Sequence, residues 1–481
     1  MSNRVGGPSR VNTVIEGKNK QLSARQIALD VLVRVDRDGS YSNLLLHQTL
    51  QKHELSRPDA ALATELVYGT IQRLNTIDYF LAQFVKQGLR KLEPWVKCLL
   101  RLSFYQLYYL ERIPEHAAVN EAVNIAKKKG HQGISGMVNG VLRNVIRQKA
   151  SLTIPERLAP AARIALLHSH PEWLVARWIE QYGIGATERM CAAANVPPHV
   201  SIRMNRLKSD RTELIAELAE EGIDAAPSAL APAGIVVTNA GNMALNPKFG
   251  AGVFSIQDES SMLVAELVDP QPGMRVLDCC AAPGGKTAHM AEKMDDRGEI
   301  IACDIHEHKQ ALIEAQAKRL GLKSIRTIVQ DARELAGRFP EDSFDRVLLD
   351  APCSGLGVIR RKPEIKWTKQ AEDITAVSVV QRDLLEQVKR LVKPGGVLVY
   401  STCTVERSEN DKMIEAFLQD NPDFRLDADP GGPAGALRQK LEQTSVADAG
   451  ASAAVLPMGM VQILPQQFGT DGFFIARLIR V

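Results

Sequence analysis

The chain has 481 residues, of which 24% are charged, and a formal net charge of +3. This length exceeds that of a typical single domain and predicts roughly two to four domains. The weak positive balance excludes a global field that attracts nucleic acid, so any such contact must come from local patches. Seven cysteines without regular spacing, no secretory leader and no apolar run of about 20 residues predict a cytoplasmic protein without a membrane span.

The N-terminal part divides into a tail and a helical region. Residues 1–20 contain glycine and proline without apolar periodicity, and we expect a flexible tail. Across residues 21–150, apolar side chains recur every fourth position, and prolines and glycines separate the helices. Examples are Ile27, Val31 and Val35, followed later by Val138, Leu142 and Ile146. The pattern predicts an all-α domain.

Two segments of this domain resemble a known RNA-binding protein. Residues 113–127 and 135–144 look like the fold of the antitermination factor NusB. The resemblance implies RNA binding, which a basic set on these helices could serve, although a solvated helix face explains such a set equally well. The members of this first basic set are Lys127, Lys128, Lys129, Arg143, Arg147 and Lys149.

Residues 151–252 alternate between two kinds of pattern. Helical segments at 173–182 and 212–221 flank a β-like piece at 199–205, with prolines between them. Such alternation predicts a small α+β module that leads into the C-terminal region.

Two tryptophans of this module are expected inside the fold, and two arginines are expected at its surface. Trp173 and Trp178 fall within an apolar helical pattern, so we expect them in the core. Arg203 and Arg206 are expected to contact RNA.

A strand followed by a glycine turn opens the region 253–481. Residues 271–278 predict a strand, and residues 279–287 predict a turn that enters a helix. Gly284 and Gly285 would let the backbone approach a ligand where the helix presents free N–H groups. The turn therefore predicts a cofactor site.

A nucleoside triphosphate loop is the rival interpretation of the same turn. Gly285, Lys286 and Thr287 copy the end of a Walker A motif, but Cys280 occupies the position of its first glycine. The dinucleotide pattern of three glycines is also absent, so neither phosphate motif is expected.

Three later strands each lead to an acidic residue. Asp304, Asp331 and Asp350 follow consecutive apolar runs. Asp304 lies where a nucleotide-binding α/β unit places its ribose-binding carboxylate, roughly 20 residues past the glycine turn. A helix N-cap could explain any one of them, but the ordered set favours a ligand site at one sheet edge.

Two cysteines stand after apolar runs that predict buried parallel strands. Cys353 follows the strand that ends at Asp350, and Cys403 follows the run at 396–400. Because the carboxyl ends of parallel strands meet at one edge, both thiols should reach one cleft. A disulfide is geometrically conceivable, but a reducing cytoplasm disfavours it. Packing is the expected role of four other cysteines, Cys98, Cys191, Cys279 and Cys303.

No metal is expected, because the sequence lacks a Cys-x-x-Cys pair and a His/Cys cluster. A second basic set follows Cys353, and its position favours RNA binding over a merely solvated surface. Its members are Arg360, Arg361, Lys362, Lys366 and Trp367.

The last part of the chain predicts an insertion and a closing strand. Residues 430–435 and 447–454 are rich in small residues and predict a loop insertion. Residues 470–479 return to a strand pattern and are expected to close the sheet antiparallel.

The ordered motifs from residue 254 to the C-terminus resemble the RNA cytosine-5 methyltransferases of the Nol1/Nop2/Sun group. The resemblance implies a Rossmann-like class I domain that uses S-adenosylmethionine. It also implies that Asp304 holds the ribose, that Asp331 lies near the adenine, and that Asp350 lies between cofactor and base. The loop on the methionine side would be Cys280, Ala281, Ala282, Pro283, Gly284, Gly285 and Lys286.

The chemistry implied by this family needs a thiol. Carbon 5 of cytosine is a poor nucleophile, and attack of a thiolate at carbon 6 activates it by covalent catalysis. The resemblance assigns Cys403 as nucleophile and Cys353 as the residue that assists release, although spacing alone leaves the choice open. Lys286 is a candidate for the positive charge that favours the thiolate. Asp350 would accept a hydrogen bond from the cytosine amino group.

The complete prediction is a multidomain protein: an all-α NusB-like domain, a small α+β module and an α/β Rossmann-like methyltransferase domain. Together the halves resemble bacterial enzymes that methylate one cytosine of 16S rRNA, either naked or in an early small-subunit particle. We expect a monomer without metal or membrane. The same chemistry on tRNA or another rRNA site, and a non-catalytic rRNA assembly factor, remain alternatives. A DNA methyltransferase is disfavoured by the second motif cysteine.

Overall fold

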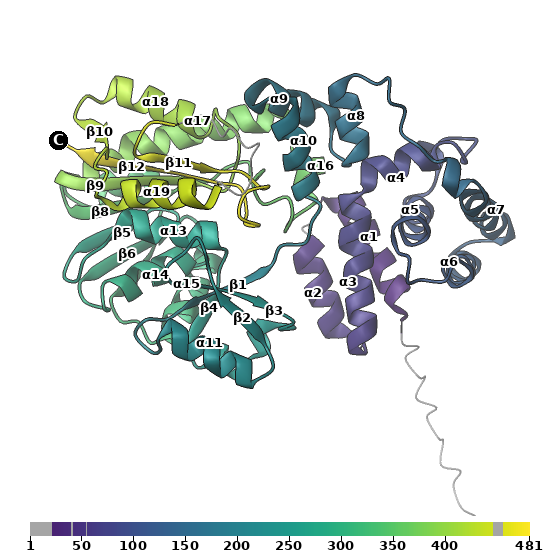
Figure 1. Cartoon of the computed structure of the whole chain (residues 1–481), viewed down its shortest axis with the longest axis horizontal. Helices are drawn as coiled ribbons and strands as arrows, with labels where there is room; N and C mark the ends of the chain where they lie inside the picture. The colour runs from purple at the N-terminus through teal and green to yellow at the C-terminus, as the bar shows by residue number, and fades with distance from the viewer. Residues whose placement is uncertain (1–21, 40–41, 54, 446–455) are drawn as a thin grey trace, which may run out of the picture. The chain divides into compact units, whose positions relative to one another are not determined.

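The computed structural model describes residues 22–39, 42–53, 55–445 and 456–481. The chain divides into two compact units (Figure 1). The first comprises Met1–Thr70 and Phe84–Lys149, and the second comprises Ile71–Gln83 and Ala150–Val481. The tail expected at 1–20 and the small-residue stretch expected at 447–454 lie outside the described residues.

The described part of the first unit is helical, as predicted. Ser23 and Gln26 form a capping box that starts α1. On α7, Val138, Leu142 and Val145 form one buried stripe, because residues three or four apart share a helix face. The elements are α1 (Ala24–Asp38), α2 (Ser42–Lys52), α3 (Arg57–Gln72), η1 (Leu89–Lys91), α5 (Pro94–Tyr109), α6 (Glu115–Lys129), α7 (Gln132–Gln148) and η2 (Lys149–Ser151).

The second unit begins with four helices. They are α4 (Leu74–Leu81), α8 (Pro160–Leu167), α9 (Glu172–Tyr182) and α10 (Ile184–Ala193). Trp178 is fully buried in their core, and Trp173 is partly buried against the same cluster. The expectation that both tryptophans pack in a core is confirmed.

A small antiparallel sheet follows and confirms the predicted α+β module. Its strand order is β2-β3-β1-β4. Leu214 and Leu218 of α11 pack against Ile202, Ile235 and Phe254 of the sheet. The elements are β1 (Val200–Met204), α11 (Arg211–Glu220), β2 (Asp224–Pro227), β3 (Gly234–Thr238), η3 (Met243–Leu245), α12 (Pro247–Gly250) and β4 (Phe254–Ile256).

A larger mixed sheet forms the centre of the second unit. Its order is β10-β12-β9-β8-β5-β6-β7, and β11 also pairs with β12. The five strands from β9 to β7 run parallel, whereas β12 pairs antiparallel with β9, β10 and β11. The strands are β5 (Arg275–Asp278), β6 (Glu299–Asp304), β7 (Ile325–Val329), β8 (Phe344–Asp350), β9 (Val392–Thr402), β10 (Phe424–Leu426), β11 (Met460–Ile463) and β12 (Phe473–Arg480). The predicted closing antiparallel strand is confirmed.

Helices cover both faces of this sheet (Figure 1). Val276 belongs to the cluster beneath α13, α14, α15 and α19, whereas its neighbour Leu277 joins the cluster beneath α17 and α18. Strand side chains alternate between faces, so a strand buried on both sides is apolar throughout. The helices are α13 (Glu259–Val268), α14 (Gly285–Lys293), α15 (Glu307–Leu320), η4 (Ala332–Gly337), α16 (Ile365–Thr368), α17 (Ala371–Val388), η5 (Lys389–Leu391), α18 (Asp411–Asp420) and α19 (Pro433–Ser445). The predicted Rossmann-like architecture is confirmed.

One loop prediction is only partly right. Residues 430–435 include the start of α19 at Pro433, because proline fits the first turn of a helix. Among the described helices, none is both long and apolar enough to cross a bilayer.

Candidate active site

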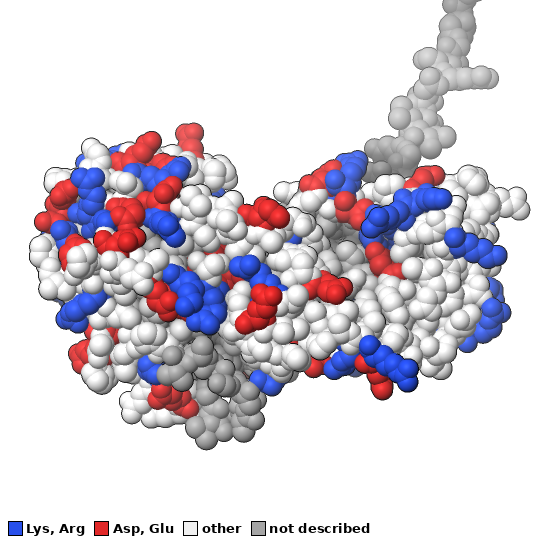
Figure 2. All heavy atoms as spheres, turned by 90° about the horizontal axis from the view of Figure 1, so that it is seen from above, with Lys and Arg blue, Asp and Glu red and all other residues white. Residues whose placement is uncertain are grey.

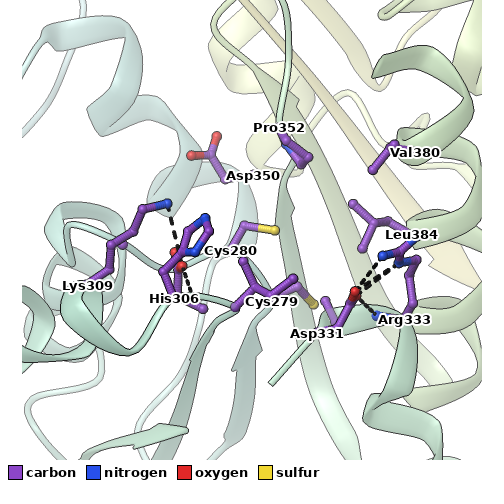
Figure 3. A pocket seen from close by; sticks show the side chains of 14 residues that line it. Cys279, Cys280, His306, Lys309, Asp331, Arg333, Asp350, Pro352, Val380 and Leu384 are labelled. Carbon is purple, nitrogen blue, oxygen red and sulfur yellow. Dashed lines mark hydrogen bonds and ion pairs between the residues drawn. The ribbon is translucent and has the colours of Figure 1, made fainter. Parts of the chain in front are cut away.

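A cavity of about 360 Å³ lies at the carboxyl ends of the central parallel strands. Ligands of open α/β sheets bind at this edge. Figure 3 shows the acidic side chains and Cys280 around the cavity. The lining residues are Cys279, Cys280, Ala282, Asp304, Ile305, His306, Lys309, Asp331, Ala332, Arg333, Asp350, Pro352, Val380 and Leu384.

A smaller cavity of about 160 Å³ adjoins the same loop. The two cavities share Cys280, Ala282 and Asp350. The smaller one is also lined by Ile256, Gln257, Ser261, Asp278, Ala281, Pro283, Gly285 and Lys286. The two cavities therefore lie next to each other along the turn after β5.

Most of the predicted cofactor loop faces this space, but Gly284 does not line either cavity. Its φ of +100° requires glycine, and a Cβ there would lie 3.1 Å from Ile313 Cα. Gly284 therefore lets the turn pack against α15 and start α14. The predicted role of this residue becomes indirect, through the shape of the loop.

Asp278 is an unpredicted buried acid below the loop. Its Oδ2 accepts a hydrogen bond of 2.7 Å from the Thr287 hydroxyl, and its Oδ1 has no partner among the described residues. Burial raises the pKa of Asp278 to about 7, because a buried carboxylate loses its hydration and the hydrogen bond from Thr287 only partly compensates this loss. Its position at the end of β5 could have suggested a site role.

Asp304 and Asp331 lie on the larger cavity, as expected for residues that contact a cofactor. Asp304 accepts a backbone hydrogen bond from His306 and lies 3.5 Å from the Lys309 ammonium. Asp331 comes two residues after β7, where it caps η4 and pairs with Arg333 at 2.6 Å. That guanidinium holds the pKa of Asp331 below its usual range.

Asp350 ends β8 between the two cavities. Its Oδ2 lies 2.7 Å from the Lys286 ammonium, and its Oδ1 accepts a hydrogen bond of 2.7 Å from the Ser401 hydroxyl. Burial alone would lower the pKa of Lys286, but the Asp350 carboxylate outweighs it and the pKa is raised. Lys286 is therefore a fixed positive charge in the site.

The two motif cysteines meet beside this ion pair. Cys403 follows β9, Cys353 lies three residues after β8, and their sulfurs are 3.4 Å apart. The hydrogen bond from the Cys353 thiol lowers the pKa of Cys403, and Lys286 acts in the same direction. That same hydrogen bond, together with burial, raises the pKa of Cys353. The sulfur–sulfur contact allows either thiol to be the donor, and the opposed pKa directions, with Lys286 on the side of Cys403, favour a thiolate at Cys403 and a thiol at Cys353.

Sequence reasoning missed two buried carboxylates just after Cys403. Glu406 accepts hydrogen bonds from Arg177, Trp178 and Gln181 of α9, and Glu409 accepts one from the backbone of Ser354. Both are fully buried. The available signal was the presence of two acids within six residues of Cys403.

The RNA-binding interpretation of the second basic set is wrong for two of its five members, Arg360 and Lys366, which are buried. Arg360 is buried and donates to backbone carbonyls, and Arg361 bridges Asp258 and Asp471 at 2.6 Å each. Lys366 is also buried and donates to the carbonyl of Gln72.

Two further members of that set have different surroundings. The Trp367 indole donates to the carbonyl of Ile71. Lys362 is exposed. The buried charges of Arg360 and Lys366 therefore stabilise the fold, and RNA contact by Arg361, Lys362 and Trp367 stays a prediction.

The RNA contact expected for Arg203 is wrong for the same reason. Arg203 is fully buried, and its guanidinium binds both carboxylate oxygens of Glu292 at 3.0 and 2.7 Å. It also donates to the carbonyl of Gly285, so it anchors the start of α14. Arg206 is exposed beside Asp295, and its contact with RNA stays a prediction.

The first basic set lies at the surface of α6 and α7. Its lysines at 127–129, together with Arg143 and Arg147, are exposed, and Lys129 pairs with Asp30 at 2.7 Å. Figure 2 shows both signs of charge interspersed on the visible face, which agrees with the small net charge. RNA binding by this set remains a prediction.

Cys98, Cys191, Cys279 and Cys303 are buried, as expected of packing residues. Within the described ranges, no group of three or more His, Cys, Asp or Glu side chains could hold a metal ion.

Three family profiles match the chain. Residues 265–479 match the 16S rRNA methyltransferase RsmB/F family, and residues 22–147 match the NusB family. Residues 170–244 match the ferredoxin-like domain of RsmF/B-like methyltransferases.

Full-length relatives and solved structures agree with these matches. The probable ribosomal RNA small subunit methyltransferase B of Bacillus subtilis (strain 168) is 45% identical, over 95% of this chain and 99% of its own. The Pseudomonas syringae pv. tomato ribosomal RNA small subunit methyltransferase B is 35% identical over 96% and 97%. The crystal structure of PH0851 superposes with a TM-score of 0.77 and 28% identity over 95% of this chain and 100% of its own. A methyltransferase homolog from Pyrococcus horikoshii gives 0.56 and 29% over 67% and 100%.

Proposed function

Because the chain belongs to the 16S rRNA methyltransferase RsmB/F family, we propose that it methylates carbon 5 of a specific cytosine in 16S rRNA. The methyl donor is S-adenosylmethionine, and the reaction passes through a covalent bond between Cys403 and the base. The observation that carries this proposal is the pair of unlike thiols at 3.4 Å, next to the ion pair of Lys286 and Asp350.

The cavities suit a nucleoside joined to an amino acid. A volume of about 360 Å³ falls in the range of roughly 300–1,000 Å³ that is usual for small-molecule sites. Asp304 would hold the ribose hydroxyls, and Asp331 would lie on the adenine side. The loop from Cys280 to Lys286, with Asp350, would hold the amino-acid end. When bound, the cofactor supplies an electrophilic methyl group.

Cys403 starts the reaction as a thiolate. Its sulfur forms a bond to carbon 6 of cytosine, and the electrons of the ring double bond become available at carbon 5. Carbon 5 then takes the methyl group, whose former bonding electrons stay with the departing sulfur of the donor. Covalent attack thus splits one difficult step into two easier ones.

Release restores the aromatic ring. The proton on carbon 5 leaves to a base, its bonding electrons re-form the ring double bond, and the bond from carbon 6 to the Cys403 sulfur breaks. Cys353 assists this expulsion as the hydrogen-bond partner of the leaving sulfur, which it contacts at 3.4 Å in the free protein. The Cys403 thiolate is then ready for another turnover.

Asp350 and Lys286 orient the base and the nucleophile. The Asp350 carboxylate, held by Lys286 and Ser401, would accept a hydrogen bond from the cytosine N4 amino group. Uracil presents an acceptor there, so the same carboxylate would reject it. Lys286 stabilises the Cys403 thiolate by its charge.

A trapping experiment tests the covalent step. Cys353→Ser is incubated with unmodified 16S rRNA and S-adenosylmethionine, and complexes are separated on a denaturing gel. We expect a protein–RNA adduct that persists under denaturing conditions and that disappears when Cys403→Ser is added to the same chain. No adduct with Cys353→Ser, or an equal adduct in the double variant, would contradict the assigned roles.

A further inference from the structure

Glu409 lies beneath both cysteine-bearing turns and is fully buried. Its Oε2 accepts a hydrogen bond of 2.8 Å from the backbone N–H of Ser354, the residue after Cys353. Its Oε1 accepts one of 3.5 Å from the hydroxyl of Thr404, the residue after Cys403. One carboxylate therefore binds to the neighbour of each thiol.

A wider hydrogen-bond frame fixes this carboxylate. The Gln381 amide of α17 donates both to Glu409 Oε2 at 3.0 Å and to the carbonyl of Pro352 at 2.8 Å. The Tyr400 hydroxyl donates to the backbone carbonyl of Glu409 at 2.7 Å. The hydroxyls of Ser354 and Thr404 lie 2.7 Å apart and join the two turns directly. Movement of either turn would break several buried hydrogen bonds.

We propose that Glu409 is a positioning residue that holds the two turns together and keeps Cys353 the donor and Cys403 the acceptor of the thiol hydrogen bond. This inference rests on the proposed function, in which Cys403 attacks and Cys353 stays protonated. Glu409 acts through the thiols and does not itself contact the base.

Different charges act on the two thiols. After the thiol hydrogen bond and burial, the Glu409 carboxylate and then Asp350 raise the pKa of Cys353. For Cys403, Asp350 opposes the thiolate, whereas Lys286 and Lys362 lower the pKa. The titratable groups that face the pair are Lys286, Asp350, Lys362, Tyr400 and Glu409, with Glu406 behind Glu409.

Glu409 fits its site as an acceptor. Burial raises the pKa of Glu409, and the donors from Ser354 and Gln381 oppose this effect because they bond to the charged form. The negative charge of Glu409 acts on Cys353 and the positive charge of Lys286 acts on Cys403, so the two charges distinguish thiols that are otherwise alike.

Alkylation rates test this role without any methyl transfer. Iodoacetamide reacts with thiolates, so its rate at each cysteine over a range of pH follows ionisation. Tryptic peptides 347–360 and 391–407 contain Cys353 and Cys403 separately, each as the sole cysteine, and Glu409→Gln changes neither. Mass spectrometry of the full-length protein can therefore follow both thiols in one sample.

In the wild type, Cys403 should react at lower pH than Cys353. In Glu409→Gln, we expect the ratio of the Cys403 rate to the Cys353 rate at neutral pH to fall about tenfold, which corresponds to one pKa unit. Glu406→Gln is the matched control, since it removes a buried carboxylate of the same loop that binds α9 instead; its ratio should stay within about twofold of wild type. An unchanged ratio in Glu409→Gln would overturn the proposal.

A second variant covers the case in which Glu409→Gln fails to fold. Gln381→Met removes one donor to Glu409 and the bond to Pro352, and it should move the ratio in the same direction by a smaller factor. No movement there would also contradict the role. If Glu409→Gln lowers the alkylation ratio but the wild-type protein methylates no RNA, the positioning role is supported and the proposed function is refuted. If the wild-type protein methylates RNA but Glu409→Gln leaves the alkylation ratio unchanged, only the positioning role is refuted.

Discussion

The turn after β8 and the turn after β9 differ in chemistry although they match in form. Each places a cysteine, followed by Ser354 or Thr404, at the same edge of the sheet, and the two sulfurs are 3.4 Å apart. The Lys286 charge lowers the pKa of Cys403, whereas the Glu409 carboxylate, bound to the backbone of Ser354, raises the pKa of Cys353. Fixed charges of opposite sign can therefore give neighbouring thiols different tasks.

The largest expected effect on methyl transfer comes from replacing Cys403, the proposed nucleophile on the turn after β9. Cys403→Ser replaces the thiolate by a hydroxyl that does not ionise near neutral pH. We expect single-turnover methyl transfer to fall by roughly 10⁴-fold or more, as when other enzymes lose their nucleophile. Binding of S-adenosylhomocysteine, measured by calorimetry, should remain, because Cys403 lines neither cavity.

Removing the positive charge of Lys286 should make the pKa values of Cys403 and Cys353 more alike. In Lys286→Met, the pKa of Cys403 should rise, so that its alkylation at neutral pH slows about tenfold. The sign follows because a cation favours the thiolate and its loss favours the thiol. Lys362→Met is the control: it is exposed and contributes less to the pKa of Cys403, so the change should be smaller. Equal effects would contradict the role given to the ion pair.

Replacing Asp304, which lines the larger cavity, should weaken cofactor binding without changing the relative reactivity of the two cysteines. Asp304→Asn should weaken the affinity for S-adenosylhomocysteine about tenfold, because a charged acceptor for the ribose is lost. The alkylation ratio of the two cysteines should not change. Asp342→Asn, whose carboxylate pairs with Arg480 outside the cavity, is the matched surface control. Wild-type affinity in Asp304→Asn would argue against the assigned ribose site.

The last prediction concerns the stability of the fold and tests the buried acid below the cofactor loop. The pKa of Asp278 is about 7 in the folded protein, above its usual value near 4. Its protonated form suits the fold, so its contribution to stability is complete below about pH 4 and is lost as pH rises through 7. Because the shift is about three pKa units, Asp278→Asn should be more stable than wild type by roughly 4 kcal/mol at alkaline pH and similar to it in acid. Thermal melts of both proteins at several pH values measure this difference, and a stability advantage of Asp278→Asn that shrinks as pH rises would contradict the prediction.

Much of the fold could be predicted because its signals are local. Apolar periodicity identified the helical domain, and continuous apolar runs identified parallel strands covered on both faces. The acids at strand ends could be placed together because parallel strands share an edge. Gly284 was recognised as part of the turn, but its contact with α15 depends on a distant helix.

The errors concern charges whose partners are distant in sequence. Arg203 pairs with Glu292, 89 positions away, and Lys366 donates to Gln72, 294 positions away. A basic run in a sequence does not reveal whether a buried acceptor awaits it. Glu409 was missed for the same reason, since its partner Ser354 lies on another turn, 55 positions away.

The most direct test is transfer of labelled methyl from S-adenosylmethionine to unmodified 16S rRNA, with the labelled base mapped. Wild type, Cys403→Ser and Cys353→Ser would be compared. We predict label in 5-methylcytosine at one position with wild type, none with Cys403→Ser, and a trapped adduct with Cys353→Ser. Label in another base, full transfer by Cys403→Ser, or no transfer to rRNA by a protein that binds the cofactor would contradict this account, and the last result would favour an assembly factor.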